Sequence, residues 1–213
     1  DANFQLLQSK INAINNEKQV HFEKFKEHDF IFLRPIYSNK KYTYHLAIHI
    51  ESLYIFLIKK KLFVDADDKE FNREVFFCEN YKHRCLVKFY GFLNEQKEKK
   101  EEKIAGFVYE YMSNDSLSSY VSTHPERIND IFSLMTVKRI FQGMVYLHSN
   151  SLIHRDLKPL NILLDHDFIP YISDFETIRT VFNEEQLNSD EEMTNDFGFR
   201  SYLFFWLNYL FFV

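Results

Sequence analysis

The chain has 213 residues and a formal net charge of −5, from 26 Lys and Arg against 31 Asp and Glu. Nucleic-acid binding depends on neutralising phosphates with basic side chains, so this balance argues against a nucleic-acid partner. The hydrophobic content of 46% is enough for a real core, and the length allows one large domain or two small lobes.

Cysteine usage and the chain ends predict a cytoplasmic protein. Cys78 and Cys85 are the two cysteines, and they fit structural thiols in a reducing compartment better than a disulfide framework. The first thirty residues mix charges and carry no apolar run typical of a signal peptide. Residues 203–213 are apolar but too short to cross a bilayer as a helix, so we expect an aberrant or buried tail and no membrane partner.

Residues 1–28 are predicted to form an N-terminal amphipathic helix. Apolar residues recur there mostly at three- and four-residue spacing, the period of one helix face. They are Phe4, Leu7, Ile11, Ile14, Phe22 and Phe25. The pattern favours a helix that packs on the domain that follows it.

Residues 29–111 are predicted to form a small lobe of strands with one helix. Short apolar runs suit five strands. These runs are 30–35, 42–51, 53–59, 86–93 and 104–111. Phe71, Val75 and Cys78 share one face of a helix over 70–80, between the third and fourth strands. The charge run at 95–103 is expected at a hairpin tip.

Helical patterns dominate after a linker at residues 112–115. One short helix is expected at 117–121 and a long one at 131–148, inside a second lobe over 116–202. Strands followed by helices predict an α+β fold with two lobes, a small antiparallel sheet and a helical part.

Chemistry-bearing residues are concentrated in residues 154–165, which read HRDLKPLNILLD. This loop offers a carboxylate at Asp156, an amine at Lys158 and a carboxamide at Asn161. Asp174 adds a second carboxylate shortly after it. Phosphoryl transfer needs a carboxylate to accept the hydroxyl proton, a cation beside the phosphoryl group, and oxygen ligands for Mg²⁺.

The loop resembles the catalytic segment of protein kinases, H-R-D-L-x-x-x-N, with the D-F-G segment behind it. The resemblance implies that Asp156 is the catalytic base and that Lys158 steadies the γ-phosphate. It also implies that Asn161 and Asp174 are the two metal ligands, with ATP and Mg²⁺ as cofactors and a protein hydroxyl as acceptor. The LKP sequence is similar to that of the serine/threonine or tyrosine-kinase-like branch.

The same resemblance implies a two-lobed kinase-like fold and assigns the nucleotide side. Glu74 matches the glutamate of the regulatory helix, and its lysine partner lies within 59–61. Lys59 is favoured because it ends an apolar run, and Lys60 is the alternative. Glu110 and Met112 match hinge residues that meet the adenine edge.

Several positions depart from the kinase pattern. Tyr37, Asn39 and Tyr42 occupy all three glycine positions of the nucleotide loop, where positive φ would strain the two tyrosines. Tyr44 and Leu57 replace small residues of the adenine slot, which predicts weaker ATP binding.

Three functions therefore stay open. The first is a protein serine/threonine kinase-like domain by ancestry, the second a pseudokinase scaffold that binds protein partners, and the third an inactive gene fragment. The kinase pattern stops soon after the activation segment, which predicts a truncated helical lobe. The sequence predicts no particular substrate or oligomeric state.

Overall fold

A computed structural model describes residues 24–62, 68–96 and 102–180 of the chain. The chain divides into two compact units, one comprising Asp1–Asp67 with Lys88–Tyr111 and the other Asp68–Val87 with Met112–Val213. We call them the sheet unit and the helical unit. The α+β class predicted from the sequence is confirmed by their contents.

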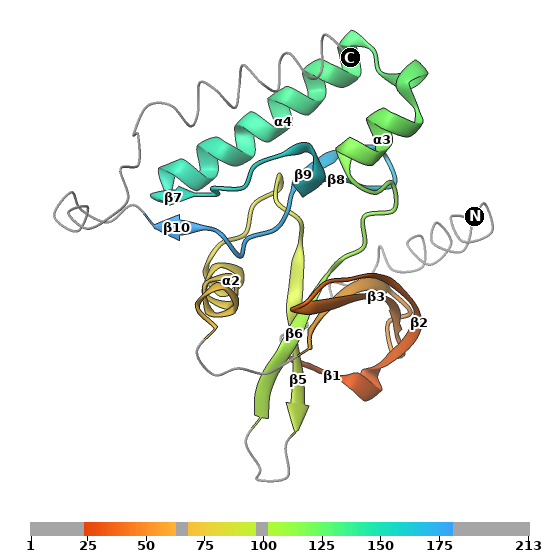
Figure 1. Ribbon diagram of the computed structural model, residues 1–213, viewed down its shortest axis with the longest axis vertical. Helices are drawn as coiled ribbons and strands as arrows, with labels where there is room; N and C mark the ends of the chain where they lie inside the picture. The colour runs from red at the N-terminus through yellow and green to blue at the C-terminus, as the bar shows by residue number, and fades with distance from the viewer. Residues whose placement is uncertain (1–23, 63–67, 97–101, 181–213) are drawn as a thin grey trace, which may run out of the picture. The chain divides into compact units, whose positions relative to one another are not determined.

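The sheet unit contains one six-stranded sheet, drawn in red to yellow-green in Figure 1. Its strands are β1 (Lys24–Lys26), β2 (Phe30–Ser38), β3 (Tyr42–His49), β4 (Ile55–Lys61), β5 (Phe89–Gln96) and β6 (Glu102–Glu110), in the spatial order β1-β5-β6-β4-β3-β2. The five strands predicted within 30–111 are all present and pair antiparallel. The sixth strand, β1, pairs parallel with β5.

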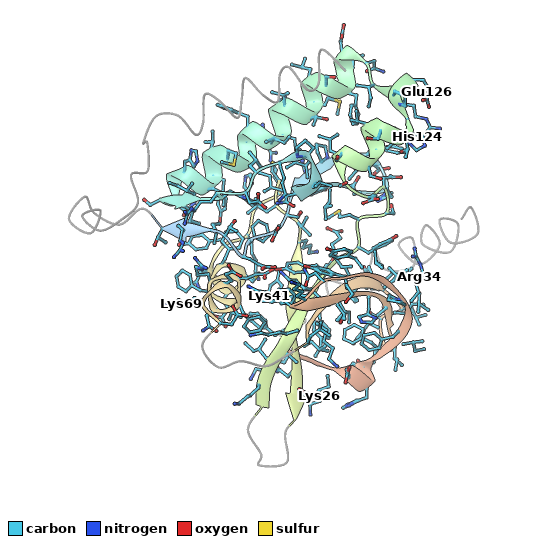
Figure 2. All side chains as sticks on the ribbon, in the orientation of Figure 1. Lys26, Arg34, Lys41, Lys69, His124 and Glu126 are labelled. Atoms are coloured by element: carbon cyan, nitrogen blue, oxygen red, sulfur yellow. The ribbon has the colours of Figure 1, made fainter. Side chains whose placement is uncertain are left out.

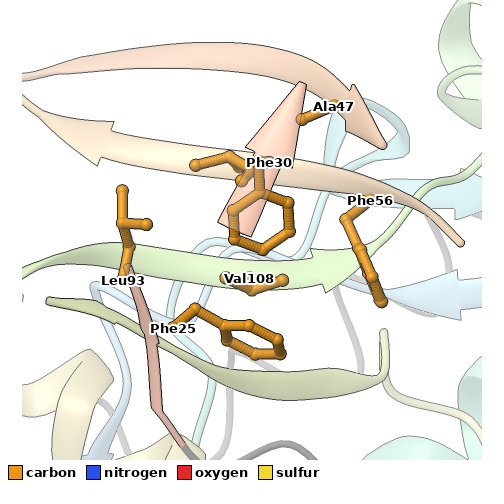
Figure 3. Packing of buried hydrophobic residues seen from close by; sticks show 7 residues of the cluster. Phe25, Phe30, Ala47, Phe56, Leu93 and Val108 are labelled. Atoms are coloured by element: carbon orange, nitrogen blue, oxygen red, sulfur yellow. The ribbon is translucent and has the colours of Figure 1, made fainter. Parts of the chain in front are cut away.

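Alternation along the strands builds the core of this unit. Successive side chains of a strand point to opposite faces, so every second residue can be buried. One face gathers a cluster of buried residues, shown in Figure 3: Phe25, Phe30, Ala47, Phe56, Ile58, Leu93 and Val108. Charged residues such as Lys26 and Arg34 are exposed and lie at the periphery of the unit (Figure 2).

The predicted N-terminal helix over 1–28 is wrong at its end. Lys24–Lys26 is a strand with only its middle residue buried, and a 3₁₀ turn, η1 (Glu27–Asp29), follows it. Phe25 enters the core beside Phe30, with ring centroids 5.3 Å apart, and this burial outweighs the helical spacing of Phe22 and Phe25. The rest of the predicted helix lies outside the described residues.

The helical unit holds α2 (Lys69–Asn80), α3 (Leu117–Thr123) and α4 (Asp130–Ser149). Each helix is capped at its start by a side chain that accepts hydrogen bonds from backbone N–H groups of the first turn. The capping residues are Asp68, Ser116 and Asn129, respectively. Two small antiparallel pairs complete the unit (Figure 1): β7 (Leu152–Ile153) with β10 (Arg179–Thr180), and β8 (Ile162–Leu164) with β9 (Pro170–Ile172). Short 3₁₀ turns η2 (Pro125–Arg127) and η3 (Pro159–Asn161) link these elements.

The helix predicted inside the first lobe groups instead with the helical unit. Residues 68–87 join it because Ile172 of β9 receives a bond from the amide of Val87 and donates one to the carbonyl of Cys85, at 2.8 and 2.9 Å. The break between the units at Tyr111 and Met112 falls where the expected hinge begins. The predicted tail at 203–213 lies outside the described residues, and no helix in the described part is long and apolar enough to span a membrane.

Truncating Phe25 tests whether β1 is part of the core. We expect Phe25→Ala to lower the free energy of unfolding by about 3–5 kcal/mol, the usual cost of removing a buried aromatic ring. Ile31→Ala is the control, because Ile31 is 54% exposed and a surface change typically costs less than about 0.5 kcal/mol. Urea denaturation measures both, and equal effects would contradict the placement of β1.

Candidate active site

The loop at 154–161 is held between the two small strand pairs of the helical unit. It begins directly after β7, passes through η3 and enters β8. Because β7 pairs with β10 and β8 with β9, both ends of the loop are fixed by backbone hydrogen bonds. Ser173, which follows β9, is bonded through its amide and its Oγ to the carbonyl of Asn161, each at 2.9 Å.

Asn161 connects the predicted base to the rest of the site. Its Nδ2 donates to the carbonyl oxygen of Asp156 at 2.8 Å and to Asp156 Oδ2 at 2.9 Å. The side chain of Asn161 is buried, so these bonds are shielded from competing water. Its amide oxygen makes neither of these bonds and is left to accept from, or coordinate, another group.

Asp156 and Lys158 form a partly exposed ion pair. Lys158 Nζ lies 2.6 Å from Asp156 Oδ2, and the Asp156 side chain is 33% exposed. Both bonds to the Asp156 side chain therefore reach Oδ2, and Oδ1 is the oxygen left for an incoming hydroxyl. The structure thus brings three of the predicted residues, Asp156, Lys158 and Asn161, into direct contact.

His154 anchors the loop through two hydrogen bonds. Its Nε2 donates to the carbonyl of Ser173 at 2.9 Å, and Thr177 Oγ1 donates to the His154 carbonyl at 2.7 Å. Within the described residues, the buried Nδ1 has no hydrogen-bond partner. Burial lowers the pKa of His154 from its ordinary 6.5, so the ring is neutral at pH 7.

Asp174 lies one residue after Ser173 and has a positive φ of 66°. Arg155 has a similar φ of 68°. A non-glycine residue in the left-handed region costs roughly 1–2 kcal/mol. Such strain is typical of functional sites that the surrounding structure over-determines, and here one instance lies in the loop and the other just after β9.

Lys59 lies on one face of the sheet among aromatic rings. Its Nζ is 4.3 Å from the centroid of Tyr42, 5.5 Å from Phe107 and 6.0 Å from Tyr44. Lys59 is only 3% exposed, so the ammonium is largely removed from water. Gly106 allows this packing, since a Cβ there would lie 2.3 Å from the Lys59 carbonyl oxygen.

Lys60 points to the opposite face. Its Nζ forms an ion pair of 2.5 Å with Glu27 of η1. A cavity of about 410 Å³ lies beside this pair and is lined by Glu27, Phe32, Thr43, His45, Lys60, Lys61 and Leu62. Most of the lining residues on β3 and β4 lie on the face of the sheet opposite to Lys59, because successive side chains of a strand point to opposite faces. The cavity is therefore not the predicted nucleotide site.

The β2–β3 hairpin, where the glycine positions lie, is closed by a side chain. Asn39 Oδ1 accepts from the amides of Lys41 and Tyr42 at 2.8 and 2.7 Å. The predicted strain is wrong, because none of Tyr37, Asn39 and Tyr42 has a positive φ. Tyr42 is fully buried instead, and Tyr37 is exposed.

The remaining predicted nucleotide residues are distributed over both units. Tyr44 and Leu57 are half-buried on the same sheet face as Lys59, as their strand positions require. Glu110 ends β6 and its amide donates to Lys88, while Met112 is buried in the helical unit. Glu74 is buried on α2 of the helical unit, so its pairing with Lys59 and the adenine contacts stay predictions.

Two features escaped prediction. The first is the packing of the Phe77 ring on Phe175, with centroids 4.3 Å apart. The Asn39 cap was also missed. Its signal was present, because asparagine before a turn commonly bonds to the backbone two or three residues on.

The chain is similar in sequence to known protein kinases. A family described as protein tyrosine and serine/threonine kinase matches residues 54–199. From Arabidopsis thaliana, cysteine-rich receptor-like protein kinase 37 is 33% identical over 137 residues, covering 62% of this chain and 20% of the relative. G-type lectin S-receptor-like serine/threonine-protein kinase RKS1 is 36% identical over 138 residues, covering 62% and 16%. The chain thus spans about a fifth of the length of these relatives.

The lowered pKa of His154 predicts a pH-dependent stability. A histidine whose folded pKa lies below 6.5 stabilises the fold above that pH, and this contribution is lost as the pH falls, because the unfolded state then binds the proton more readily. We expect the free energy of unfolding to fall as the pH drops below 6.5, and His154→Gln to reduce that slope. His166→Gln, at an exposed position, is the control in urea denaturation, and an equal slope change there would contradict the prediction.

Proposed function

Because the chain belongs to the protein tyrosine and serine/threonine kinase family, we propose that it is a pseudokinase-like domain that binds protein partners and binds Mg·ATP weakly. The observation that carries the proposal is the closed hairpin. Asn39 Oδ1 accepts hydrogen bonds from the backbone amides of Lys41 and Tyr42. In a kinase of the expected pattern, backbone amides of this loop would donate to the phosphates of ATP. The sequence offers no glycine at this tip to release the amides from Asn39.

The Lys59 face supports the same conclusion. The lysine expected to meet the nucleotide phosphates is packed over the buried ring of Tyr42 and near two further rings. A cation held over aromatic faces and shielded from water is stabilised in place. Moving the ammonium group toward a phosphate would give up that contact. On the same face of the sheet, the large side chains of Tyr44 and Leu57 leave less space for an adenine ring.

A weak serine/threonine kinase is the second candidate, and the intact catalytic loop favours it. Asp156 keeps one carboxylate oxygen available, Lys158 lies beside it, and Asn161 orients Asp156. Hydroxyl deprotonation by Asp156 and positioning of charge by Lys158 would need no rearrangement of this network. The acceptor would be a protein hydroxyl, as the family implies.

The donor set fits Mg²⁺ at two residues. Asn161 uses its Nδ2 within the loop and leaves its amide oxygen, while Asp174 supplies a carboxylate, and oxygen ligands suit this hard cation. When bound, Mg²⁺ would neutralise charge on the ATP phosphates. Asn161 and Asp174 would hold it, and Asp156 would keep its role toward the hydroxyl proton.

A cytoplasmic location also belongs to this proposal. Cys78 and Cys85 are both buried free thiols, which suits a reducing compartment. Recovery of the chain in a washed membrane fraction of expressing cells would contradict it.

We expect purified protein to show no saturable Mg·ATP binding at micromolar nucleotide. A loss of about 3 kcal/mol of affinity raises Kd more than a hundredfold. Calorimetric titration measures binding, and a radiolabel assay with an Asp156→Asn control measures transfer. Micromolar binding of Mg·ATP, together with radiolabel transfer that depends on Asp156, would show the pseudokinase hypothesis to be wrong.

A hairpin variant identifies the cause of weak binding. Asn39→Gly removes the acceptor from the Lys41 and Tyr42 amides, so we expect it to tighten Mg·ATP binding. Asn39→Ala is the matched control, because it also frees the amides but does not favour positive φ. Equal recovery in both variants would assign the block to the hydrogen bonds, and recovery in Asn39→Gly alone would assign it to backbone conformation. No recovery in either would exclude the hairpin as the cause.

Lys59, and not Lys60, is the proposed nucleotide lysine. In the Asn39→Gly background we expect Lys59→Met to lose the recovered binding, because it removes the cation from that face. Lys60→Met should retain it, because Lys60 faces Glu27 on the other side of the sheet. The same titration measures both variants, and the opposite pattern would exchange the two assignments.

A further inference from the structure

Helix α4 exposes an apolar stripe along its length. Its exposed large side chains recur at helical spacing, and each is between 46% and 70% exposed. They are Ile131, Leu134, Met135, Phe141 and Val145, and we call them the α4 stripe. Lys138 is the one charged residue among the exposed positions from Ile131 to Val145.

The opposite face of α4 is buried although it is more polar. Ser133, Thr136 and Gly143 are buried there, beside Ile140, Met144 and Leu147. Figure 1 shows α4 running beside β7 and β9, and Ile172 of β9 lies where a side chain at Gly143 would be. A helix that is apolar on its outer face as well belongs in an interior. The α4 stripe therefore calls for a cover.

We propose that the apolar segment 203–213 of the same chain packs on the α4 stripe. The segment reads LFFWLNYLFFV and carries no charged side chain. An uncharged segment suits this stripe, because the segment brings no charge of its own to bury and the long side chain of Lys138 can keep its ammonium group in water. Removing both apolar surfaces from water provides the driving force.

The other segments outside the described residues fit less well. Residues 1–23 carry several charges and connect to β1 of the sheet unit, not to the unit that contains α4. Residues 63–67 and 97–101 are short and charged, and residues 181–202 are rich in acidic side chains. Of the segments outside the described residues, only residues 203–213 combine a mostly apolar, uncharged sequence with a connection to the helical unit.

The chain geometry permits the contact. The described part of the chain ends at Thr180 of β10, which pairs with Leu152 of β7, three residues after the end of α4. The 22 residues between Thr180 and the segment reach up to roughly 70 Å when extended. Since α4 has 20 residues and is about 30 Å long, every turn of the α4 stripe is within reach.

Trp206 provides a direct readout, because it is the only tryptophan of the chain. In the full chain, we expect its fluorescence emission to be shifted to shorter wavelength and protected from acrylamide, relative to the urea-denatured protein. The double variant Leu134→Glu with Met135→Glu should abolish both effects. Phe76→Glu is the matched control, since Phe76 is an exposed aromatic on α2 of the same unit, and it should leave both effects intact.

Three results would overturn the proposal. Trp206 emission equal to that of the denatured chain would show that the segment is not packed. Shielded emission that the α4 double variant leaves unchanged would show that it packs elsewhere. Shielding that disappears on dilution would assign the α4 stripe to a second copy.

A second measurement does not require α4 to tolerate new charges. Cysteines introduced together at Met135 and Leu207 should cross-link within one chain in dilute oxidising solution, because the native Cys78 and Cys85 are buried. Pairing Leu207→Cys with Phe76→Cys is the control and should give no intramolecular product. A cross-linked dimer, or no product at Met135, would contradict the proposed contact.

Discussion

The double role of Asn161 is the constraint on which the catalytic loop depends. Its side-chain amide donates to Asp156, and its backbone carbonyl accepts from the amide and the Oγ of Ser173. One buried residue thus joins the loop to the strand that leads to Asp174. A buried polar group is costly without hydrogen bonds, so the bonds of Asn161 hold Asp156 in place and fix the backbone at Ser173, next to Asp174.

In the sheet unit, the corresponding constraint is strand alternation. It separates two neighbouring lysines onto opposite faces, one among aromatic rings and the other beside Glu27. The same alternation buries Tyr42 on the Lys59 face, so the residue at a glycine position has become part of the packing. The loop thus keeps Asp156, Lys158 and Asn161 in contact, while the hairpin residue Tyr42 is part of the packing.

The sequence predicted those parts in which the signal is local and repeated. Asp156, Lys158 and Asn161 are brought together by one short loop, and short apolar runs indicate each of the five strands between 30 and 111. The strand containing Phe25 could not be predicted in the same way, because three residues with one buried ring carry no period of their own. The Asn39 cap could have been predicted from the residue type, because an asparagine before a turn commonly accepts from backbone amides two or three residues on, but apolar spacing does not indicate it.

The strand order has a consequence for synthesis on the ribosome. β6 lies between β4 and β5, so the second edge of β4 has no partner until residues 102–110 have emerged, after the whole of α2. At roughly 5–20 residues per second, the nascent β2–β3–β4 meander waits some seconds with that edge open. During that interval the apolar side chains of Phe56 and Ile58 are available to chaperones or to neighbouring nascent chains. Because residues 68–87 of the helical unit are synthesised between β4 and β5, the sheet is completed late in translation.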